Sequence, residues 1–579
     1  MGRLPEDFLV NRFVAFVARH RLPIGVLFSS FCGAILAAGA RPALQDPVES
    51  GQVLAGIVKY PSYNPFYVYH VKLWTLFNQG AAVLLKAGVS EFSASLLIEG
   101  LVGAVSFAAI FLLVYAISGK SVVALFTPLF VHLLNLVGIS IAYPIRLLGT
   151  AHTYGIFGLT YAVLVIGVLG VGRYRTGAFL SGLAPAFHPS LGAFCVLLSG
   201  SGVFVNRREL KPELASMLWY FIAGSLLTAA SLVWQLHFFP PEAAMDPALK
   251  KKYLDAFIQN FDYHRSFDGW RHGGFLTGLL ASAVAIMASR GRRAPVGARI
   301  VFSAITASVV ATIGIAFFAE FVPFFDFLKI LIPWRFMNFA NLCLVPVALG
   351  FLAADFPRMP RLRTALFFLV LILCFLWQRG GFPDIEFLYI GIAFFVLLVA
   401  AISLPDIPAF PFRYLLKWRE RAVAAAVGVV VVIHVLPAAA SLVSRDAGTI
   451  PEIYGIASGR PGMLLTAGDM PLIQLMTGRP LLMDSGLDFF AYVPETGPRF
   501  NEILKKVYGL DLFIPPPGEQ RNAGKLTFSH RDLWEGRTMD EWRAIRKEFG
   551  VTDILTPADW RLQLPLIADD GDRSLFTIP

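Results

Sequence analysis

Long apolar stretches, separated by short polar loops, recur along most of this chain of 579 residues. A helix needs roughly 20 apolar residues to cross a bilayer, and the stretches at residues 22–40 and 95–117 meet that length. Further spans are predicted at residues 122–139 and 154–171, and from starting points near Leu214, Phe275, Ile300, Phe336, Ala365, Phe387 and Ala422. The pattern predicts a mainly α-helical, polytopic transmembrane bundle with about eleven full crossings.

One apolar stretch does not fit a single crossing. Residues 177–205 follow a basic turn and precede a second basic segment, so both of their ends carry the charges typical of the cytoplasmic side. Pro185 and the pair His188, Pro189 interrupt the stretch near its middle, and proline removes a helical hydrogen bond. We therefore expect two short helices that form a broken hairpin with His188 at its tip.

The basic loops also predict the orientation, because Lys and Arg concentrate on the cytoplasmic side of a membrane. Residues 1–21 are expected to be a cytoplasmic amphipathic segment, followed by a transmembrane region at residues 22–443. An odd number of crossings then places the first loop, residues 41–94, and the polar tail, residues 444–579, in the same extracytoplasmic compartment. The basic loops suggest a bacterial inner membrane, with a periplasmic or extracellular tail.

The tail has a pattern of its own. Short apolar stretches at residues 463–466, 480–483 and 553–555 alternate with helical patterns at residues 498–508 and 539–549. This alternation predicts a small extracytoplasmic α/β domain.

Composition supports the membrane assignment and excludes other classes. The chain is 56% hydrophobic and 15% charged, with a mean hydropathy of +0.64. Its net charge of +10 comes largely from basic loops between spans, so it does not indicate a nucleic-acid partner. The four cysteines lie in apolar segments without metal-ligand spacing, which argues against a disulfide framework or a zinc site.

Two acidic residues open the first outer loop, where a carboxylate could accept a proton from an acceptor hydroxyl. Asp46 follows the first span, and Glu49 comes three residues later. The same residues, with Pro47 between them, also fit a capping box at a helix start. The sequence therefore leaves a catalytic and a structural interpretation open.

Aromatic and basic residues follow in the same loop. Lys59, Tyr60 and Tyr63 precede an amphipathic stretch at residues 66–86, a pattern that favours an interfacial helix along the membrane. These side chains could line a groove for a lipid or sugar, or form an ordinary aromatic belt.

A third set of candidates is mainly cationic and is expected near the outer mouths of the spans, where it suits an anionic substrate. Arg335 could hold a lipid-linked phosphate through paired hydrogen bonds, or simply snorkel. The remaining candidates lie in two outer loops: Asp262, His264, Arg265, Arg146 and His152. The spacing of His264 and His272 matches no common ligand pattern, so no metal site is predicted there.

The first-loop acid, the odd crossing number, the broken hairpin and the outer α/β tail together resemble the C-type (GT-C superfamily) polytopic membrane glycosyltransferases. The resemblance implies that Asp46, with Glu49 as second choice, deprotonates the acceptor, and that Arg335 and Arg265 stabilise the departing phosphate. The first loop lacks the adjacent Asp-Glu pair of mannosyltransferases and aminoarabinose transferases. The tail lacks the W-W-D sequence of oligosaccharyltransferase.

The resemblance implies transfer of a sugar, with inversion, from a polyprenyl-phosphate donor to an extracytoplasmic glycan, lipid or protein acceptor. The expected partners are that donor, membrane lipids and the acceptor. No cofactor is firmly implied, and a divalent cation stays open. A transporter or a lipid or oligosaccharide flippase, with a site at the broken hairpin, is the main alternative. A noncatalytic subunit of an envelope polysaccharide system is another.

Overall fold

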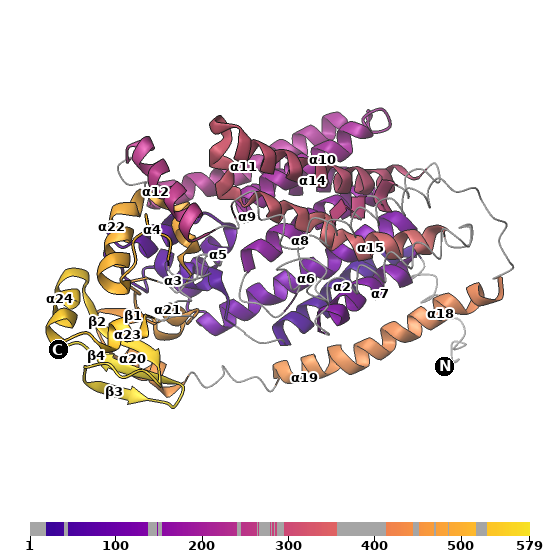
Figure 1. Ribbon diagram of the computed structural model, residues 1–579. Helices are drawn as coiled ribbons and strands as arrows, with labels where there is room; N and C mark the ends of the chain where they lie inside the picture. The colour runs from indigo at the N-terminus through magenta and orange to yellow at the C-terminus, as the bar shows by residue number, and fades with distance from the viewer. Residues whose placement is uncertain are drawn as a thin grey trace, which may run out of the picture.

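The computed structural model describes residues 19–39, 44–136, 148, 153–239, 245–262, 265, 278–279, 281–282, 284–286, 294–355, 413–443, 451–467, 470–483, 486–516 and 530–579. This part of the chain is mainly helical, with one small sheet near the C-terminus (Figure 1). The spans predicted near Ala365 and Phe387, most of the one near Phe275, and the candidates Arg146, His152 and His264 lie outside the described residues.

Six described helical segments are long and apolar enough to cross a membrane. They are α2 (Arg21–Gly39), α6 (Glu91–Ser118), α11 (Leu214–Phe238), α14 (Val296–Phe321), the segment Pro333–Ala354 that ends in α15 (Asn338–Asp355), and the segment Arg421–Val443 that spans α18 (Arg413–Val430) and α19 (Leu436–Val443). Shorter apolar helices are α7 (Ser121–Leu136), α8 (Thr153–Gly170) and α10 (Pro189–Val205). The mainly helical fold with several candidate spans is confirmed, whereas the count of eleven crossings stays a prediction.

Small residues let the long helices approach closely. Gly33 of α2 faces Gly103 of α6, and a Cβ atom on either residue would collide with the backbone oxygen of the other. At the start of α14, a Cβ atom on Gly297 would collide with the backbone oxygen of Gly170 at the end of α8. Close contact between backbones is a common means of packing helices in lipid, where no hydrophobic effect drives them together.

The predicted break at His188 is confirmed. α9 (Tyr174–Phe187) ends there and α10 begins with Pro189, while the His188 side chain accepts a hydrogen bond from the Leu191 amide. At the other end of the hairpin, Arg175 lies 3.7 Å from Glu213, which follows α10. The start of α9 and the loop after α10 therefore meet at one end of the bundle, as a hairpin requires.

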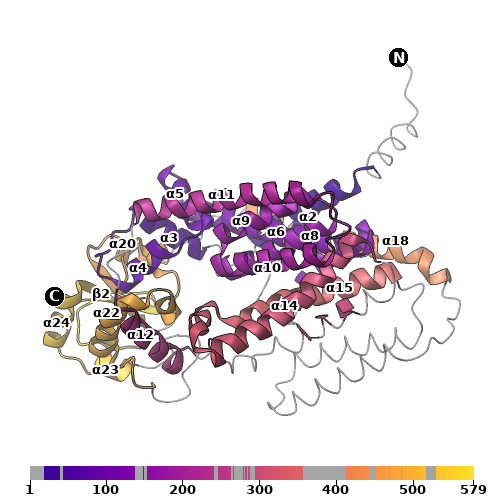
Figure 2. The same ribbon diagram turned by 90° about the horizontal axis from the view of Figure 1, so that it is seen from above.

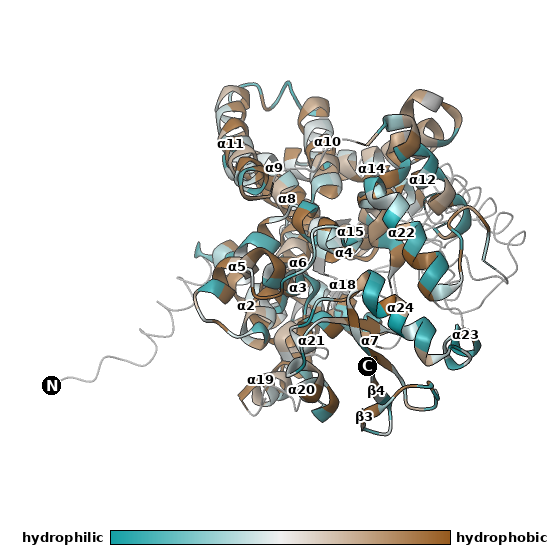
Figure 3. Ribbon diagram, turned by 90° about the vertical axis from the view of Figure 1, so that its left-hand side faces the viewer, coloured by the Kyte–Doolittle hydropathy of each residue, from teal (hydrophilic) through white to brown (hydrophobic). Residues whose placement is uncertain are grey.

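The C-terminal domain lies at one end of the long helices (Figure 1, Figure 2). Its sheet has the strand order β1 (Met463–Thr466), β2 (Val551–Pro557), β4 (Arg573–Thr577) and β3 (Leu566–Asp569), with β1 and β2 parallel and the other pairs antiparallel. Its main helices are α20 (Glu452–Ser458), α22 (Gly497–Ile503), α23 (Arg531–Glu535) and α24 (Met539–Phe549). Figure 3 shows hydrophilic and hydrophobic residues alternating along α22 and α24.

Most of the tail prediction holds in the described residues. β1 and α24 have the predicted bounds, and residues 553–555 lie inside β2. Residues 498–508 form α22 and a following π-helical turn, Leu504–Tyr508. Residues 480–483 were expected as a strand, but only one bridge, from Leu481 to Leu464, extends the sheet there. The β3–β4 hairpin was not predicted.

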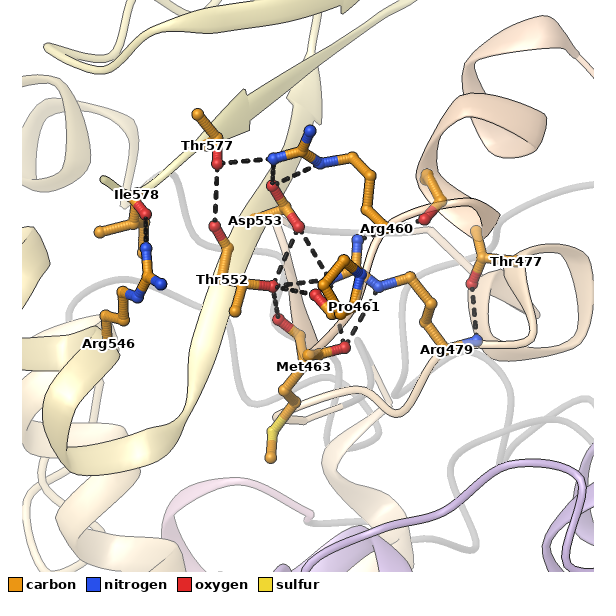
Figure 4. Close-up of polar contacts among 12 residues, drawn as sticks. Arg460, Pro461, Met463, Thr477, Arg479, Arg546, Thr552, Asp553, Thr577 and Ile578 are labelled. Atoms are coloured by element: carbon orange, nitrogen blue, oxygen red, sulfur yellow. Dashed lines mark hydrogen bonds and ion pairs between the residues drawn. The ribbon is translucent and has the colours of Figure 1, made fainter.

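A buried ion-pair network ties the strands of this domain together (Figure 4). Arg479 donates to the Asp553 carboxylate at 2.8 Å and to Thr552 Oγ1 at 2.7 Å. Arg460 donates to the other Asp553 oxygen at 2.9 Å and to Thr577 Oγ1 at 2.8 Å. Burial disfavours the Asp553 carboxylate, but the two arginines outweigh it and lower its pKa. The network therefore links β2 and β4 to the segments that carry Arg460 and Arg479.

A second hydrophobic core joins three segments that are far apart in the sequence: α4 (Pro65–Lys72), α12 (Pro247–Asn260) and the C-terminal domain. The ring centroids of Phe66 and Phe489 are 5.3 Å apart, as are those of Phe257 and Phe490. The first loop, the loop after α11 and the tail therefore fold against one another. That they share one extracytoplasmic compartment stays a prediction from the loop charges.

Candidate functional site

The candidate site lies where the first loop meets the bundle and the tail. The loop folds into α3 (Asp46–Ala55), α4 and α5 (Leu76–Lys86). The stretch expected as one interfacial helix at residues 66–86 is thus two helices, separated at residues 73–75. Phe66 and Val68 of α4 are buried in the core of the C-terminal domain. Because protein covers these residues, the prediction of a helix lying along the membrane is wrong for α4.

The start of α3 tests the helix-cap interpretation of Asp46. Gln45 is the N-cap, with an extended backbone at φ −129° and ψ 135°, and its side chain makes no capping hydrogen bond. Asp46 is already inside the helix, followed by Pro47 in the first turn. The capping box, which required Asp46 as the N-cap, is therefore wrong.

The acids belong to a polar face of α3. Asp46, Glu49 and Ser50 are spaced by three and four residues, so they lie on one side of the helix. Ser50 Oγ is 2.9 Å from His70 Nδ1 on α4 and 3.5 Å from the Tyr154 hydroxyl at the start of α8. Tyr154 in turn donates to Asn78 Oδ1 of α5 at 2.7 Å. Side chains of α4 and α5 from the first loop and of α8 from the bundle thus meet beside this face of α3.

His70 is neutral at this site. Burial lowers its pKa from 6.5 to about 3, because an imidazolium loses its hydration there. Its Nε2 atom is also buried, and it has no hydrogen-bond partner among the residues that the structure describes. The Ser50 and His70 pair therefore forms a polar but uncharged part of the α3 face.

Tyr69 connects the α3 face to the C-terminal domain. Burial is the main reason that the pKa of Tyr69 is raised well above its usual range. The charged or ionisable neighbours that raise it further are Tyr154, Asp488, Tyr492 and Asp46. The Tyr69 ring lies 6.3 Å from that of Tyr492, which is 41% exposed and ends η7 (Leu487–Tyr492). Tyr69 stays protonated, and its hydroxyl can donate a hydrogen bond.

Arg265 lies on the far side of Tyr492. Its guanidinium carbon is 5.1 Å from the centre of the Tyr492 ring, Nε donates to Asp262 at 2.7 Å, and Nη1 donates to the Ile330 carbonyl. Burial works against its charge, but Tyr492 and Asp262 outweigh burial and raise its pKa. Nη2 is buried without a partner in the described part of the chain. Such a group normally costs free energy, so a ligand that accepts from Nη2 would be favoured.

Arg335 lies five residues after Ile330, whose carbonyl accepts a hydrogen bond from Arg265. The backbone passes from η3 (Pro323–Leu331) to η4 (Pro333–Met337) through Ile332, whose φ of +52° is unusual for a β-branched residue. The Arg335 amide donates to the Ile332 carbonyl at 2.9 Å. The charge of Arg335 lies within electrostatic reach of His188 at the hairpin tip. One strained turn therefore carries Arg335 and the carbonyl that binds Arg265.

The remaining candidates have different surroundings. Lys59 is exposed, and the ring of Tyr63 lies 5.0 Å from the guanidinium of Arg499 on α22. Tyr60 hydrogen-bonds to Gln474 in the tail at 2.6 Å. Tyr60 thus contacts the residue of the tail that binds α3, whereas Lys59 and Tyr63 lie toward the surface.

Sequence reasoning missed several residues of this site. Ser50 could have been found, because it follows Asp46 by one helical turn. Tyr154, Gln474 and Tyr492 carry no local signal, since they reach the site from a span and from the tail. The described residues contain no group of three or more His, Cys, Asp or Glu side chains that could hold a metal.

Comparison with models of known protein families gives no match, and neither does comparison with curated proteins. The site is therefore interpreted from its own residues.

Proposed function

We propose that this protein is a membrane glycosyltransferase that transfers a sugar from a polyprenyl-phosphate donor to an acceptor hydroxyl. One observation carries the proposal: Asp46 lies within electrostatic reach of Tyr69, and the buried guanidinium of Arg265 lies 5.1 Å from the neighbouring ring of Tyr492. Such a transfer needs a base for the acceptor and a cationic donor for the departing phosphate. These two groups supply both.

Asp46 accepts the proton of the acceptor hydroxyl. The acceptor oxygen then forms a bond to the anomeric carbon from the side opposite the phosphate, while the bond from that carbon to the phosphate oxygen breaks. The electron pair leaves with the phosphate, and the configuration is inverted. Nη2 of Arg265 donates to the phosphate, and Arg335 adds positive charge from the neighbouring turn. Glu49, 7% exposed on the same helical face, is the second candidate for the base.

The surroundings of Arg265 suit a phosphate carried on a lipid. The Ile330 carbonyl that accepts from Arg265 belongs to η3, and the same short helix exposes Phe324 and Phe327 by 81% and 57%. η3 directly follows the span α14. The exposed apolar side chains and the carbonyl that binds the buried Arg265 thus lie on one short helix at the end of a span, which fits an isoprenoid chain and its phosphate.

The test uses the full-length protein in lipid nanodiscs, supplied with a set of polyprenyl-phosphate sugars and candidate acceptors, and measures release of polyprenyl phosphate. Asp46→Asn is expected to lower release by roughly 100-fold or more, the range for loss of a general base. Asp255→Asn is the matched control, because Asp255 forms an exposed pair with Lys251 at 3.2 Å on α12. Unchanged release in Asp46→Asn would move the base to another residue, and no release by the wild type would contradict the glycosyltransferase proposal.

A further inference from the structure

A short helix of the tail packs against both the bundle and its own domain. α21 (Ile473–Thr477) lies between two left-handed residues, Leu472 with φ +62° and Gly478 with φ +64°. Glycine adopts this conformation freely, but leucine rarely does, so tertiary packing must hold Leu472. Leu475, 5% exposed, belongs to the main hydrophobic core of the bundle, and Leu472 packs against that core. α21 is therefore anchored at the bundle, beside α3 (Figure 1, Figure 3).

Gln474 of α21 makes a fully buried contact with α3. Its side-chain amide donates to the Glu49 carbonyl at 2.8 Å and to Gln52 Oε1 at 3.3 Å. A helical carbonyl that accepts its intrahelical bond keeps a second lone pair, which Gln474 can use. Gln52 returns a hydrogen bond to the Leu475 carbonyl at 3.5 Å. The two short helices are thus joined in both directions.

The amide of Gln474 is itself held in one orientation. Its oxygen accepts from the Tyr60 hydroxyl at 2.6 Å, and that hydroxyl accepts from the Leu481 amide at 3.0 Å. The NH₂ group must therefore face α3, because the oxygen is already used by Tyr60. Glutamate at this position could not donate to Glu49, and it would place two acceptors against each other.

These contacts matter because α3 cannot hold its own position. It has 10 residues, and a helix this short is marginal without tertiary packing. On another side it packs on α5, where Gly51 meets Ala81 so closely that a Cβ atom would not fit. A rotation of α3 would move Asp46, Glu49 and Ser50 together, since they share one face.

We propose that the C-terminal domain positions the acidic face of α3 through α21, and that Gln474 is the positioning residue. The domain then does more than cover the first loop, because a contact in the tail sets the direction of the Asp46 carboxylate. The role in catalysis rests on the glycosyltransferase function proposed above, whereas the mechanical link between α21 and α3 does not.

The test compares Gln474→Glu with Gln563→Glu in the full-length protein. Gln563 is a matched control, because its exposed amide also donates to a backbone carbonyl, that of Glu535, at 3.4 Å. Hydrogen exchange of the α3 amides is expected to rise by about tenfold in Gln474→Glu, the effect of leaving a buried hydrogen bond unmade, while exchange in α6 stays unchanged. The control should alter neither helix.

Steady-state kinetics supply the second readout. In Gln474→Glu we expect kcat to fall by about tenfold, with KM for the donor changed less than about twofold, because the variant misdirects a base and leaves donor contacts intact. If Gln474→Glu does not fold, Gln474→Met keeps the volume and removes only the hydrogen bonds, and the same changes are expected.

Three outcomes are decisive. Unchanged exchange of α3 in a folded Gln474 variant overturns the mechanical link. Faster exchange of α3 with an unchanged kcat overturns the positioning role in an active enzyme. If the wild type itself releases no polyprenyl phosphate, the proposed function fails, while faster exchange of α3 would still support the link to α21.

Discussion

The Glu49 carbonyl accepts a 2.8 Å hydrogen bond from the Gln474 side chain, although 425 residues separate them in the sequence. The bond joins a helix of the first loop to a helix of the tail. In the sequence, all but one of the six candidate spans lie between these two helices. The candidate base and the C-terminal domain are therefore parts of one assembly.

Replacing Arg265 with lysine should separate its role in binding an anion from its role in the fold. Lysine retains a positive charge beside Asp262 but cannot also donate toward the Ile330 carbonyl and a phosphate, because its charge is a single point. We expect kcat/KM for the donor to fall by roughly 10- to 100-fold, with the thermal midpoint changed little. Arg543→Lys, at an exposed pair on α24, is the control. Equal kcat/KM in both variants would remove Arg265 from the site.

His70 should make the protein less stable in mild acid. Its pKa is lowered from 6.5 to about 3 by burial. Between these two pH values, His70 is therefore protonated in the unfolded chain and neutral in the folded protein. The stability that follows from neutral His70 is full above pH 6.5 and is lost as the pH falls toward 3, with a slope of up to about 1.4 kcal/mol per pH unit. Thermal midpoints of wild type and His70→Gln, measured from pH 7.5 to pH 5, should therefore converge in acid. Parallel curves would contradict this role.

Removing the charge of Asp553 should unfold the C-terminal domain selectively. The carboxylate is 1% exposed and binds both Arg460 and Arg479, so Asp553→Asn leaves buried positive charge uncompensated and should cost about 3–5 kcal/mol. Asp540→Asn removes a 3.0 Å pair with Arg543 at a side chain that is 88% exposed, and it should cost less than about 0.5 kcal/mol. Denaturant unfolding, followed by the fluorescence of Trp534 and Trp542, distinguishes the two. Similar midpoints would argue against a structural role for the network.

Glu495 should hold the two outer loops against the tail. It forms ion pairs with Lys72 of α4 and with Lys250 of α12, the latter at 3.3 Å. Burial opposes its charge, but the lysines outweigh burial and lower its pKa. Glu495→Gln should cost about 1–2 kcal/mol, between the values for exposed and buried pairs. Limited proteolysis should cut the variant faster between the tail and the bundle, and unchanged cleavage would count against the clamp.

The sequence by itself determined the elements whose signals are local. Hydrophobic length gave the spans α2, α6, α11 and α14, because a helix in lipid must satisfy its own backbone and be long enough to cross. Pro189 indicated the break after α9, a short apolar stretch predicted β1, and helical periodicity predicted α24, both with the observed bounds. The loop charges also predicted that the first loop and the tail share a compartment, since that follows from counting crossings.

Only the tertiary structure decided how the site is assembled. The Asp46, Pro47, Glu49 pattern fits a helix start with Asp46 as N-cap, but the N-cap is Gln45. The exact start of a short helix depends on the segments against which it packs. Gln474, Tyr154 and Tyr492 meet α3 and Arg265 from distant segments, and a single sequence carries no signal for contacts that arise when separate helices pack. The direction of a side chain depends on those contacts. The sequence therefore identified Asp46, Glu49 and Arg265 as candidates, whereas the fold determines which residues surround them.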